Sequence, residues 1–222
     1  MISSEAASCD RHPPQVNPHC SGSTPRLQAC LAILGLSLVL WPVRAGAQSS
    51  VQWTTNYYPV TGTTLSEVRQ SIRRNRPWKD RFEHDAMTNW RVKWEFTTGP
   101  TATGCQCRSF RTQTTIVVSM PGWITSTNAS DTARQLWRQY VTALGRHEAG
   151  HAELALAAAA ELHKRIQGLS EAPDCRTLEK QIGDLCQSVI EDHRKRDRAY
   201  DEKTHHGADQ GAVLPSRGRR SR

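Results

Sequence analysis

Residues 146–153 read Arg-His-Glu-Ala-Gly-His-Ala-Glu and lie inside a run of helical character that extends from about Asp131 to Gln167. Apolar side chains recur along this run at spacings of three and four, which is the period of one face of an α-helix. We expect a single long helix, capped by Asp131 and ended by Gly168, that buries this face. The face comprises Leu136, Trp137, Tyr140, Val141, Leu144, His147, His151, Leu154, Ala158, Leu162 and Ile166.

His147 and His151 are four residues apart, so a helix places both imidazoles one turn apart on the same side. Two imidazoles in this relation bind one zinc ion, and Glu148 is placed to act as general base towards a zinc-bound water. The alternative is that both histidines are hydrogen-bonded core residues. Burying two such rings and Glu148 on an apolar face without a metal is costly, so the motif predicts a zinc site.

The third zinc ligand has to come from further along the chain. The helix continues without a break after His151, and Leu154 and Ala157 stand where metzincin-type sites carry a glycine and a histidine. His163 is excluded because it lies about 18 Å from His151 along the same helix.

A second helix is predicted from near Arg176 to Ala199, and residues 168–174 would join it to the first as a helical hairpin. In such a hairpin, residues that are equally far from the turn on the two helices lie opposite one another. Residues near Arg196 would therefore lie opposite the histidine motif. The candidate ligands at that level or just beyond it are His193, Asp201 and the pair His205-His206. The spacing alone does not choose among them.

The segment before the long helix is rich in β-formers. Residues 51–60 predict a strand, Thr64 is expected to cap a short helix over 65–74, and residues 90–96 alternate apolar and charged side chains as a half-buried strand does. Residues 105–120 predict a long strand that pairs with 90–96 as an antiparallel hairpin. The predicted fold class is therefore α+β, with a small antiparallel sheet from the N-terminal half packed on the long-helix hairpin that carries the zinc site.

Residues 1–47 are typical of a signal peptide. Residues 27–40 form an apolar run too short for a membrane span, and Ala45-Gly46-Ala47 is a small-x-small cleavage site. The alternative is an uncleaved anchor, which the early end of the apolar run disfavours. We therefore expect a secreted or periplasmic protein with no stable transmembrane segment, a domain over 48–206 and a disordered basic tail over 207–222.

Four cysteines remain after the predicted cleavage: Cys105, Cys107, Cys175 and Cys186. An even number suits two disulfides in an oxidising compartment, with three possible pairings. Cys105 and Cys107 share one face of a strand, so we expect each to pair elsewhere. A structural zinc site is the competing interpretation, but the spacing lacks paired Cys-x-x-Cys motifs.

The chain carries a formal net charge of +8, part of which lies in the arginines of the tail. A nucleic-acid arm is one interpretation of such a tail. In an exported protein, a solvated end or loose contact with anionic envelope polymers is the favoured interpretation. The aromatic side chains of residues 90–96 are explained by a sheet packed on helices, so no specific nucleic-acid binding is expected.

Near the C-terminus, residues 200–207 read Tyr-Asp-Glu-Lys-Thr-His-His-Gly, which fits the pattern Y-D-x-x-T-x-H-G. This pattern resembles the C-terminal signature of a bacterial family of predicted secreted zinc-dependent proteases, domain of unknown function 922. The resemblance covers about residues 51–210. It includes Tyr58-Pro59-Val60-Thr61-Gly62, Thr88-Asn89-Trp90-Arg91-Val92-Lys93-Trp94, Gly104-Cys105, Pro121-Gly122-Trp123 and Arg146-His147-Glu148-Ala149-Gly150-His151.

By position, the resemblance implies His206 as the third zinc ligand, with Asp201 and then His193 as alternatives. Thr204 and Asp201 would then orient a ligand imidazole through its free ring nitrogen. Tyr200 is a candidate for polarising the substrate carbonyl or stabilising an oxyanion, with a packed core tyrosine as the alternative.

These features together predict an exported zinc metalloprotease that acts on a peptide or protein, with Zn²⁺ as its cofactor. Two other classes stay open: a non-enzymatic, zinc-stabilised binding protein of the envelope, and a peptidoglycan amidase or hydrolase that acts on cell-wall material. A fourth coordination position open to a cleft would separate the enzymes from the binding protein. The oligomeric state is not set by the sequence.

Overall fold

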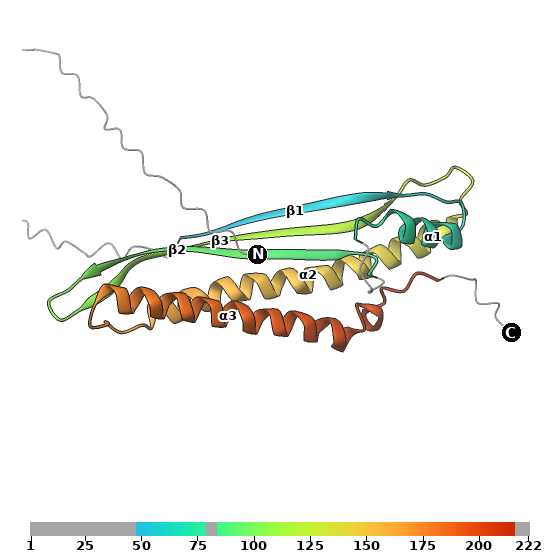
Figure 1. Ribbon diagram of the computed structural model, residues 1–222. Coiled ribbons are helices and arrows are strands. Elements are labelled where there is room, and N and C mark those ends of the chain that lie inside the picture. The colour runs from blue at the N-terminus through green and yellow to red at the C-terminus, as the bar shows by residue number, and fades with distance from the viewer. Residues whose placement is uncertain (1–47, 79–83, 216–222) are drawn as a thin grey trace, which may run out of the picture. The chain divides into compact units, whose positions relative to one another are not determined.

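The computed structural model describes residues 48–78 and 84–215 (Figure 1). The predicted signal peptide and residues 216–222 of the predicted tail lie outside the described residues. Within the described part, no helix is both long enough and apolar enough to cross a membrane. The elements in chain order are β1 Gln48–Val60, α1 Leu65–Asn75, β2 Met87–Pro100, β3 Cys105–Trp123, α2 Asp131–Gln167, α3 Cys175–Thr204 and the 3₁₀-helix η1 Ala208–Gln210.

The three strands form one sheet in the order β1-β3-β2. β2 and β3 are antiparallel, as predicted. β1 pairs with β3 in parallel, from Gln48 opposite Arg111 to Val60 opposite Trp123. The sheet is therefore mixed, which corrects the expected antiparallel sheet. Since α1 and β2 lie between β1 and β3 in the chain, no tight turn sets the direction of that pair.

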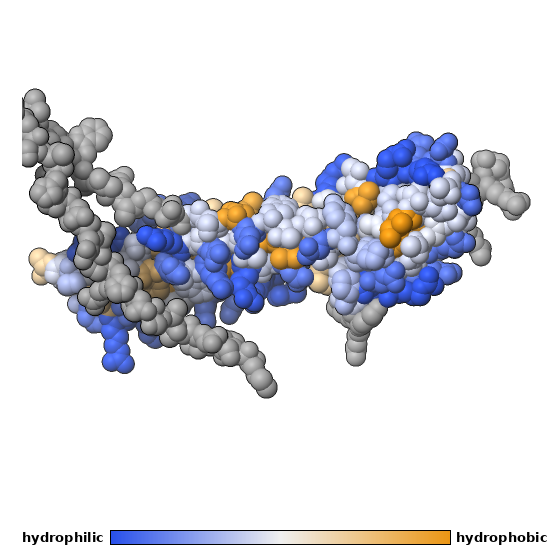
Figure 2. Space-filling view, turned by 90° about the horizontal axis from the view of Figure 1, so that it is seen from above, coloured by the Kyte–Doolittle hydropathy of each residue, from blue (hydrophilic) through white to orange (hydrophobic). Residues whose placement is uncertain are grey.

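One face of the sheet lies against the helices, and α2 and α3 run side by side beneath it (Figure 1). Seen from above, the surface is mostly hydrophilic, with hydrophobic residues in separate spots (Figure 2). The alternation of β3 produces the inner face, because every second side chain is buried. These buried residues are Phe110, Thr112, Thr114, Ile116, Val118 and Met120.

The two long helices follow the predicted periodicity and differ from it at their ends. The N-cap of α2 is Ser130 rather than Asp131, and its side chain accepts a hydrogen bond from the backbone of the first turn. α3 continues to Thr204 instead of ending near Ala199. The additional turn carries part of the C-terminal signature onto α3, beside the middle of α2.

A disulfide joins Cys105 at the start of β3 to Cys175 at the start of α3. Cys107 and Cys186 are free thiols, so the expected pair of disulfides is corrected to one among the described residues. From the bridge, the strand advances about 7 Å to Cys107, whereas the helix advances about 17 Å to Cys186.

The chain continues beyond α3 into a packed segment, residues 205–215, which we call the C-terminal strap. His205 and His206 have left-handed backbone conformations, with φ of 48° and 52°, and Gly207 follows with φ of 82°. The strap then packs against α2, and Leu214 is only 2% exposed. The folded domain therefore extends to residue 215 rather than to 206, because Leu214 belongs to the core.

Candidate metal centre

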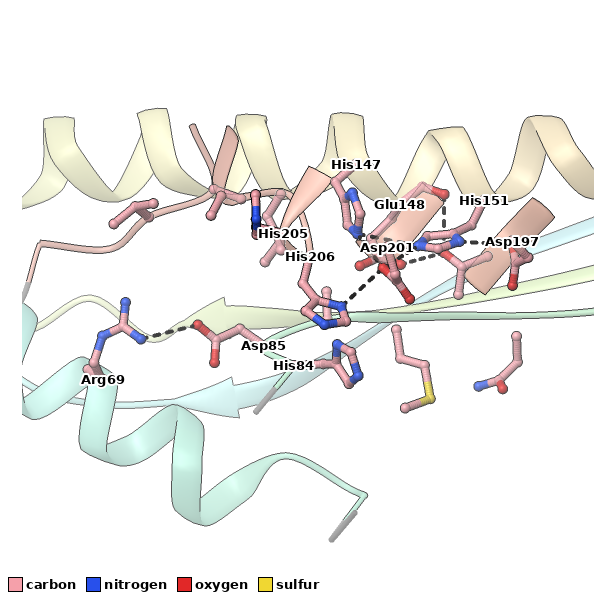
Figure 3. A pocket seen from close by; sticks show the side chains of 18 residues that line it. Arg69, His84, Asp85, His147, Glu148, His151, Asp197, Asp201, His205 and His206 are labelled. Atoms are coloured by element: carbon pink, nitrogen blue, oxygen red, sulfur yellow. Dashed lines mark hydrogen bonds and ion pairs between the residues drawn. The ribbon is translucent and has the colours of Figure 1, made fainter. Parts of the chain in front are cut away.

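Two pairs of side chains, each pair spaced by four residues, face one another across the helix hairpin. α2 presents His147 and His151, and α3 presents Asp197 and Asp201. The two Nε2 atoms are 3.3 Å apart, and Asp201 Oδ1 lies 3.1 Å from His147 Nε2 and 3.2 Å from His151 Nε2. His147, His151 and Asp201 form a group that could hold a metal ion (Figure 3).

Both imidazoles are oriented by a hydrogen bond at Nδ1, the ring nitrogen that faces away from the group. His151 Nδ1 donates to Asp197 Oδ1 at 2.9 Å, and His147 Nδ1 donates to Gln210 Oε1 at 3.1 Å. A neutral imidazole carries one N–H, so each Nε2 keeps a lone pair that faces the group.

With both rings neutral and protonated at Nδ1, three acceptor atoms meet with no donor between them. Two lone pairs and a carboxylate oxygen at this distance need a proton or a cation among them. Ligand atoms held about 2.0–2.1 Å from a tetrahedral ion are about 3.3–3.4 Å apart, and the three separations of 3.1–3.3 Å lie close to this. The residues thus fit a metal ion. Imidazole and carboxylate donors suit zinc and other divalent ions, so the donor set names no single metal.

The electrostatics of the group also favour positive charge. Burial alone would raise the pKa of Asp201, but hydrogen bonds with His147 and His151 hold this pKa well below its usual range. Burial alone would lower the pKa of His151, but Asp197 and Asp201 outweigh it and raise this pKa to about 10. Without an ion, a proton on His151 therefore supplies the positive charge.

Glu148 is buried beside the group and lines the same cavity. The hydroxyl of Thr88, on β2, donates to Glu148 Oε2 at 2.6 Å. Burial raises the pKa of Glu148, and the Thr88 hydrogen bond and the two histidines partly oppose that rise. A carboxylate with a raised pKa accepts a proton more readily, as a general base must.

The group opens into a cavity of about 680 Å³. The first residues of β2 (87–89), the middle of α2 and the strap line it. Further along the cavity, Arg69 forms an ion pair with Asp85 at 3.5 Å (Figure 3). A cavity of this size admits several residues of an extended peptide or a comparable ligand.

The structure places the three predicted candidates for the third ligand at different distances from the histidine pair. Asp201 belongs to the group. His206 lies next to it, with Nδ1 3.3 Å from Asp201 Oδ1, but it stands outside the group on the wall of the cavity. His193 lies elsewhere, where its ring nitrogens contact the Leu154 carbonyl and Glu161. The geometry therefore places Asp201 ahead of His206, the reverse of the order that the signature implied.

The family described as "Bacterial protein of unknown function (DUF922)" matches residues 55–207. The chain belongs to this family. No curated protein and no solved structure matches the chain. The DUF922 segment contains His147, Glu148, His151 and Asp201, and it ends before Gln210.

In this DUF922 protein, the residues of the C-terminal signature gather around His147. The Tyr200 ring stacks on the imidazole with centroids 5.1 Å apart and 12° between the planes, on a side that does not line the cavity. Gly150 makes room for it, because a Cβ there would overlap the phenol. Gly207 packs against the same imidazole, and Thr204 Oγ1 lies 3.4 Å from its Nδ1. This placement suits Tyr200 to holding His147 in position.

Three residues of the DUF922 site were not identified from the sequence. Asp197 had a signal, because it precedes Asp201 by four residues on α3 and so repeats the spacing of the histidines on α2. Thr88 belongs to a segment that carries the family resemblance, but nothing in the sequence connects it with Glu148, and Gln210, in the strap, had no signal. Only the folded chain brings them to Glu148 and the histidine pair.

Proposed function

We propose that this DUF922 protein is an exported zinc-dependent hydrolase, and specifically a metalloprotease. The observation that supports this most is the convergence of two imidazole lone pairs and one carboxylate oxygen at the wall of an open cavity, beside the buried carboxylate of Glu148. His147, His151 and Asp201 would hold the ion, which when bound supplies Lewis acidity at a carbonyl oxygen and makes water more acidic.

Glu148 acts as general base in this proposal. The Thr88 hydroxyl holds one carboxylate oxygen at 2.6 Å, which leaves the other oxygen to accept a proton from the attacking water. The raised pKa of Glu148 lets it keep that proton until the leaving amine takes it. Asp197 keeps the His151 imidazole in the orientation in which Nε2 would face the ion.

A peptide or protein is the substrate class we infer, because His-Glu-x-x-His on a helix is typical of peptide hydrolysis. Cell-wall material is the second candidate, since a net charge of +8 favours contact with anionic envelope polymers. A non-enzymatic binding protein accounts less well for a metal group that opens into a cavity next to a buried carboxylate.

The metal ligands are tested first. Purified protein should contain about one zinc per chain, as expected for a single three-ligand site. Asp201→Ala should lose the metal, whereas His206→Ala and His193→Ala should keep it. Loss of zinc from His206→Ala alone would restore the order implied by the signature. Retention of zinc in all three variants would contradict the helix-hairpin site.

Catalysis is tested with Glu148→Gln, which keeps the size of the side chain and removes the base. We expect this variant to retain zinc and lose turnover by at least about a hundredfold. Digestion of an unfolded protein and of cell-wall sacculi, in parallel, distinguishes a protease from a cell-wall hydrolase. Wild-type protein that binds zinc and cleaves neither substrate would support the binding-protein alternative.

Export is inferred from residues 1–47 and has its own test. Expression of the full chain in a bacterial host, followed by N-terminal sequencing of the periplasmic or secreted product, should give a mature end at Gln48. A product that keeps residues 1–47 in the cytoplasm would contradict the assignment.

A further inference from the structure

Gln210 lies in the C-terminal strap, beyond the segment that matches the family, and yet it touches a candidate metal ligand. We propose that Gln210 is a positioning residue that fixes the tautomer of His147, so that Nε2 is always the atom presented to the metal. The inference rests on the metal site of the proposed function and extends it to a residue outside the family segment.

A closed ring of hydrogen bonds connects three residues. His147 Nδ1 donates to Gln210 Oε1 at 3.1 Å, Gln210 Nε2 donates to the Tyr200 hydroxyl at 3.0 Å, and this hydroxyl donates to the His147 carbonyl at 3.3 Å. The Tyr200 hydroxyl also lies 3.3 Å from Gln210 Oε1. Gln210 Oε1 therefore acts as an acceptor whether this hydroxyl donates to the His147 carbonyl or to Gln210 itself. The amide is therefore oriented with its oxygen towards the imidazole.

An acceptor beside Nδ1 selects the tautomer of His147. Asp201 Oδ1 lies at the same 3.1 Å from Nε2 and competes for the single proton of the neutral ring. An ion held between Nε2 and Asp201 would remove this competition, and the Gln210 acceptor would then keep the proton on Nδ1. Thr204 Oγ1 is the other oxygen near Nδ1, at 3.4 Å, but it gives its own proton to the Tyr200 carbonyl at 2.8 Å. Gln210 is the nearer of the two acceptors.

The strap is anchored on both sides of Gln210. On one side it continues from α3 through Gly207, whose carbonyl accepts from the Gln210 backbone N–H at 3.0 Å. On the other side Leu214 is buried in the core, and its carbonyl accepts from Arg69 Nη2 at 2.8 Å. Because both ends are fixed, the amide is presented to His147 in one place.

The test compares variants of Gln210 in the full chain. Gln210→Leu removes the acceptor at similar volume, and Gln210→Glu keeps an acceptor. Gln210→Asn keeps the amide but is too short to reach, and Gln187→Leu, at an exposed position of α3, is the matched control. Affinities for Zn²⁺ and Co²⁺ are measured by competition with a chelator, and urea unfolding of each metal-free variant verifies folding.

We expect Gln210→Leu and Gln210→Asn to weaken metal binding by about 10- to 100-fold. Gln210→Glu and the Gln187→Leu control should bind as the wild type does. A residue that only fills space would not give this pattern, because leucine and glutamate both keep the volume of glutamine and both variants would then bind metal as the wild type does.

Unchanged metal affinity in Gln210→Leu would overturn the proposal, and so would equal losses in the leucine and glutamate variants. If the wild type binds neither ion, the proposed function and this positioning role both fall. If it binds zinc and hydrolyses nothing, the proposed function falls, and the expected pattern of affinities still supports the role of Gln210.

Discussion

Replacing Gly150 by alanine tests whether Tyr200 packs behind His147. Gly150 lies in the middle of α2, where glycine is a poor helix former, so alanine would by itself stabilise the protein by about 1 kcal/mol. The structure predicts the opposite sign, because the new Cβ would lie 2.5 Å from Cζ of Tyr200.

The size of the effect follows from that overlap. Carbon atoms in contact are about 3.5–4.0 Å apart, so the Tyr200 ring has to move by about 1 Å. Overpacking of this kind costs about 1–3 kcal/mol, which leaves a net loss of about 0–2 kcal/mol after the helix gain is subtracted. The displaced ring also leaves its stack on His147, so we expect metal affinity to fall by about tenfold.

Gly183 provides the matched control, because it lies inside α3 and a Cβ there would meet nothing within 4 Å. Gly183→Ala should therefore stabilise the protein by about 1 kcal/mol. Urea unfolding of the metal-free proteins measures both variants without a contribution from metal binding. Both substitutions gain the same helix propensity, so this contribution cancels when their free energies of unfolding are compared. The remaining difference, about 1–3 kcal/mol, is the cost of moving Tyr200.

A second background isolates the contact. In a Tyr200→Ala protein the obstacle is gone, so Gly150→Ala should stabilise by about 1 kcal/mol, as at Gly183. Equal stabilisation by Gly150→Ala and Gly183→Ala in the wild-type background, with unchanged metal affinity, would refute the packing of Tyr200 against Gly150.

Three further predictions concern the disulfide, the pH dependence and the general base. Replacing Cys105 and Cys175 by serine opens a loop of 70 residues, which should lower the free energy of unfolding by about 4 kcal/mol; an unchanged urea midpoint would contradict a stabilising bridge. The pKa of His151 in the metal-free protein is raised to about 10, above its unfolded value of about 6.5, so its contribution to stability is complete below pH 6.5 and is lost as the pH rises through 10. The same proton has to leave before a metal binds, so metal affinity should increase about tenfold per pH unit between about pH 7 and 9, and a flat profile in a chelator titration would count against the site. Thr88→Val removes the donor to Glu148 at constant shape and should lower turnover by about tenfold with metal content unchanged; wild-type turnover in this variant would show that the hydrogen bond does not orient the base.

The elements of the fold were largely predictable because their signals are local. The stripe of apolar residues predicted the extent of α2, and the short connection between the strand-like runs 90–96 and 105–120 predicted the antiparallel pairing of β2 with β3. The parallel pairing of β1 was not predictable, since parallel and antiparallel strands have the same side-chain alternation. The packed strap was missed because its buried apolar residue, Leu214, stands in a mostly polar segment that also contains glycine and proline.

The candidate site divides in the same way. His147, Glu148 and His151 lie within a single helical turn, so their spacing alone predicted their arrangement. The position of Asp201 depends on the register between α2 and α3 and on the direction of its side chain, and neither is encoded in the local spacing. His206 was ranked first by the signature, but the left-handed turn at residues 205–206 leaves it on the cavity wall beside the group.

The sequence by itself therefore determined what depends on short-range geometry: the two long helices, the antiparallel hairpin, and a histidine pair with a neighbouring carboxylate on one helical face. The tertiary structure alone decided which carboxylate completes the group, how Thr88 and Gln210 reach Glu148 and His147, and which cysteines are bridged. The physical reason is that bond geometry and the helical repeat act over a few residues. Contacts between segments far apart in the chain exist only after the core has fixed how α2, α3, the sheet and the strap lie against one another.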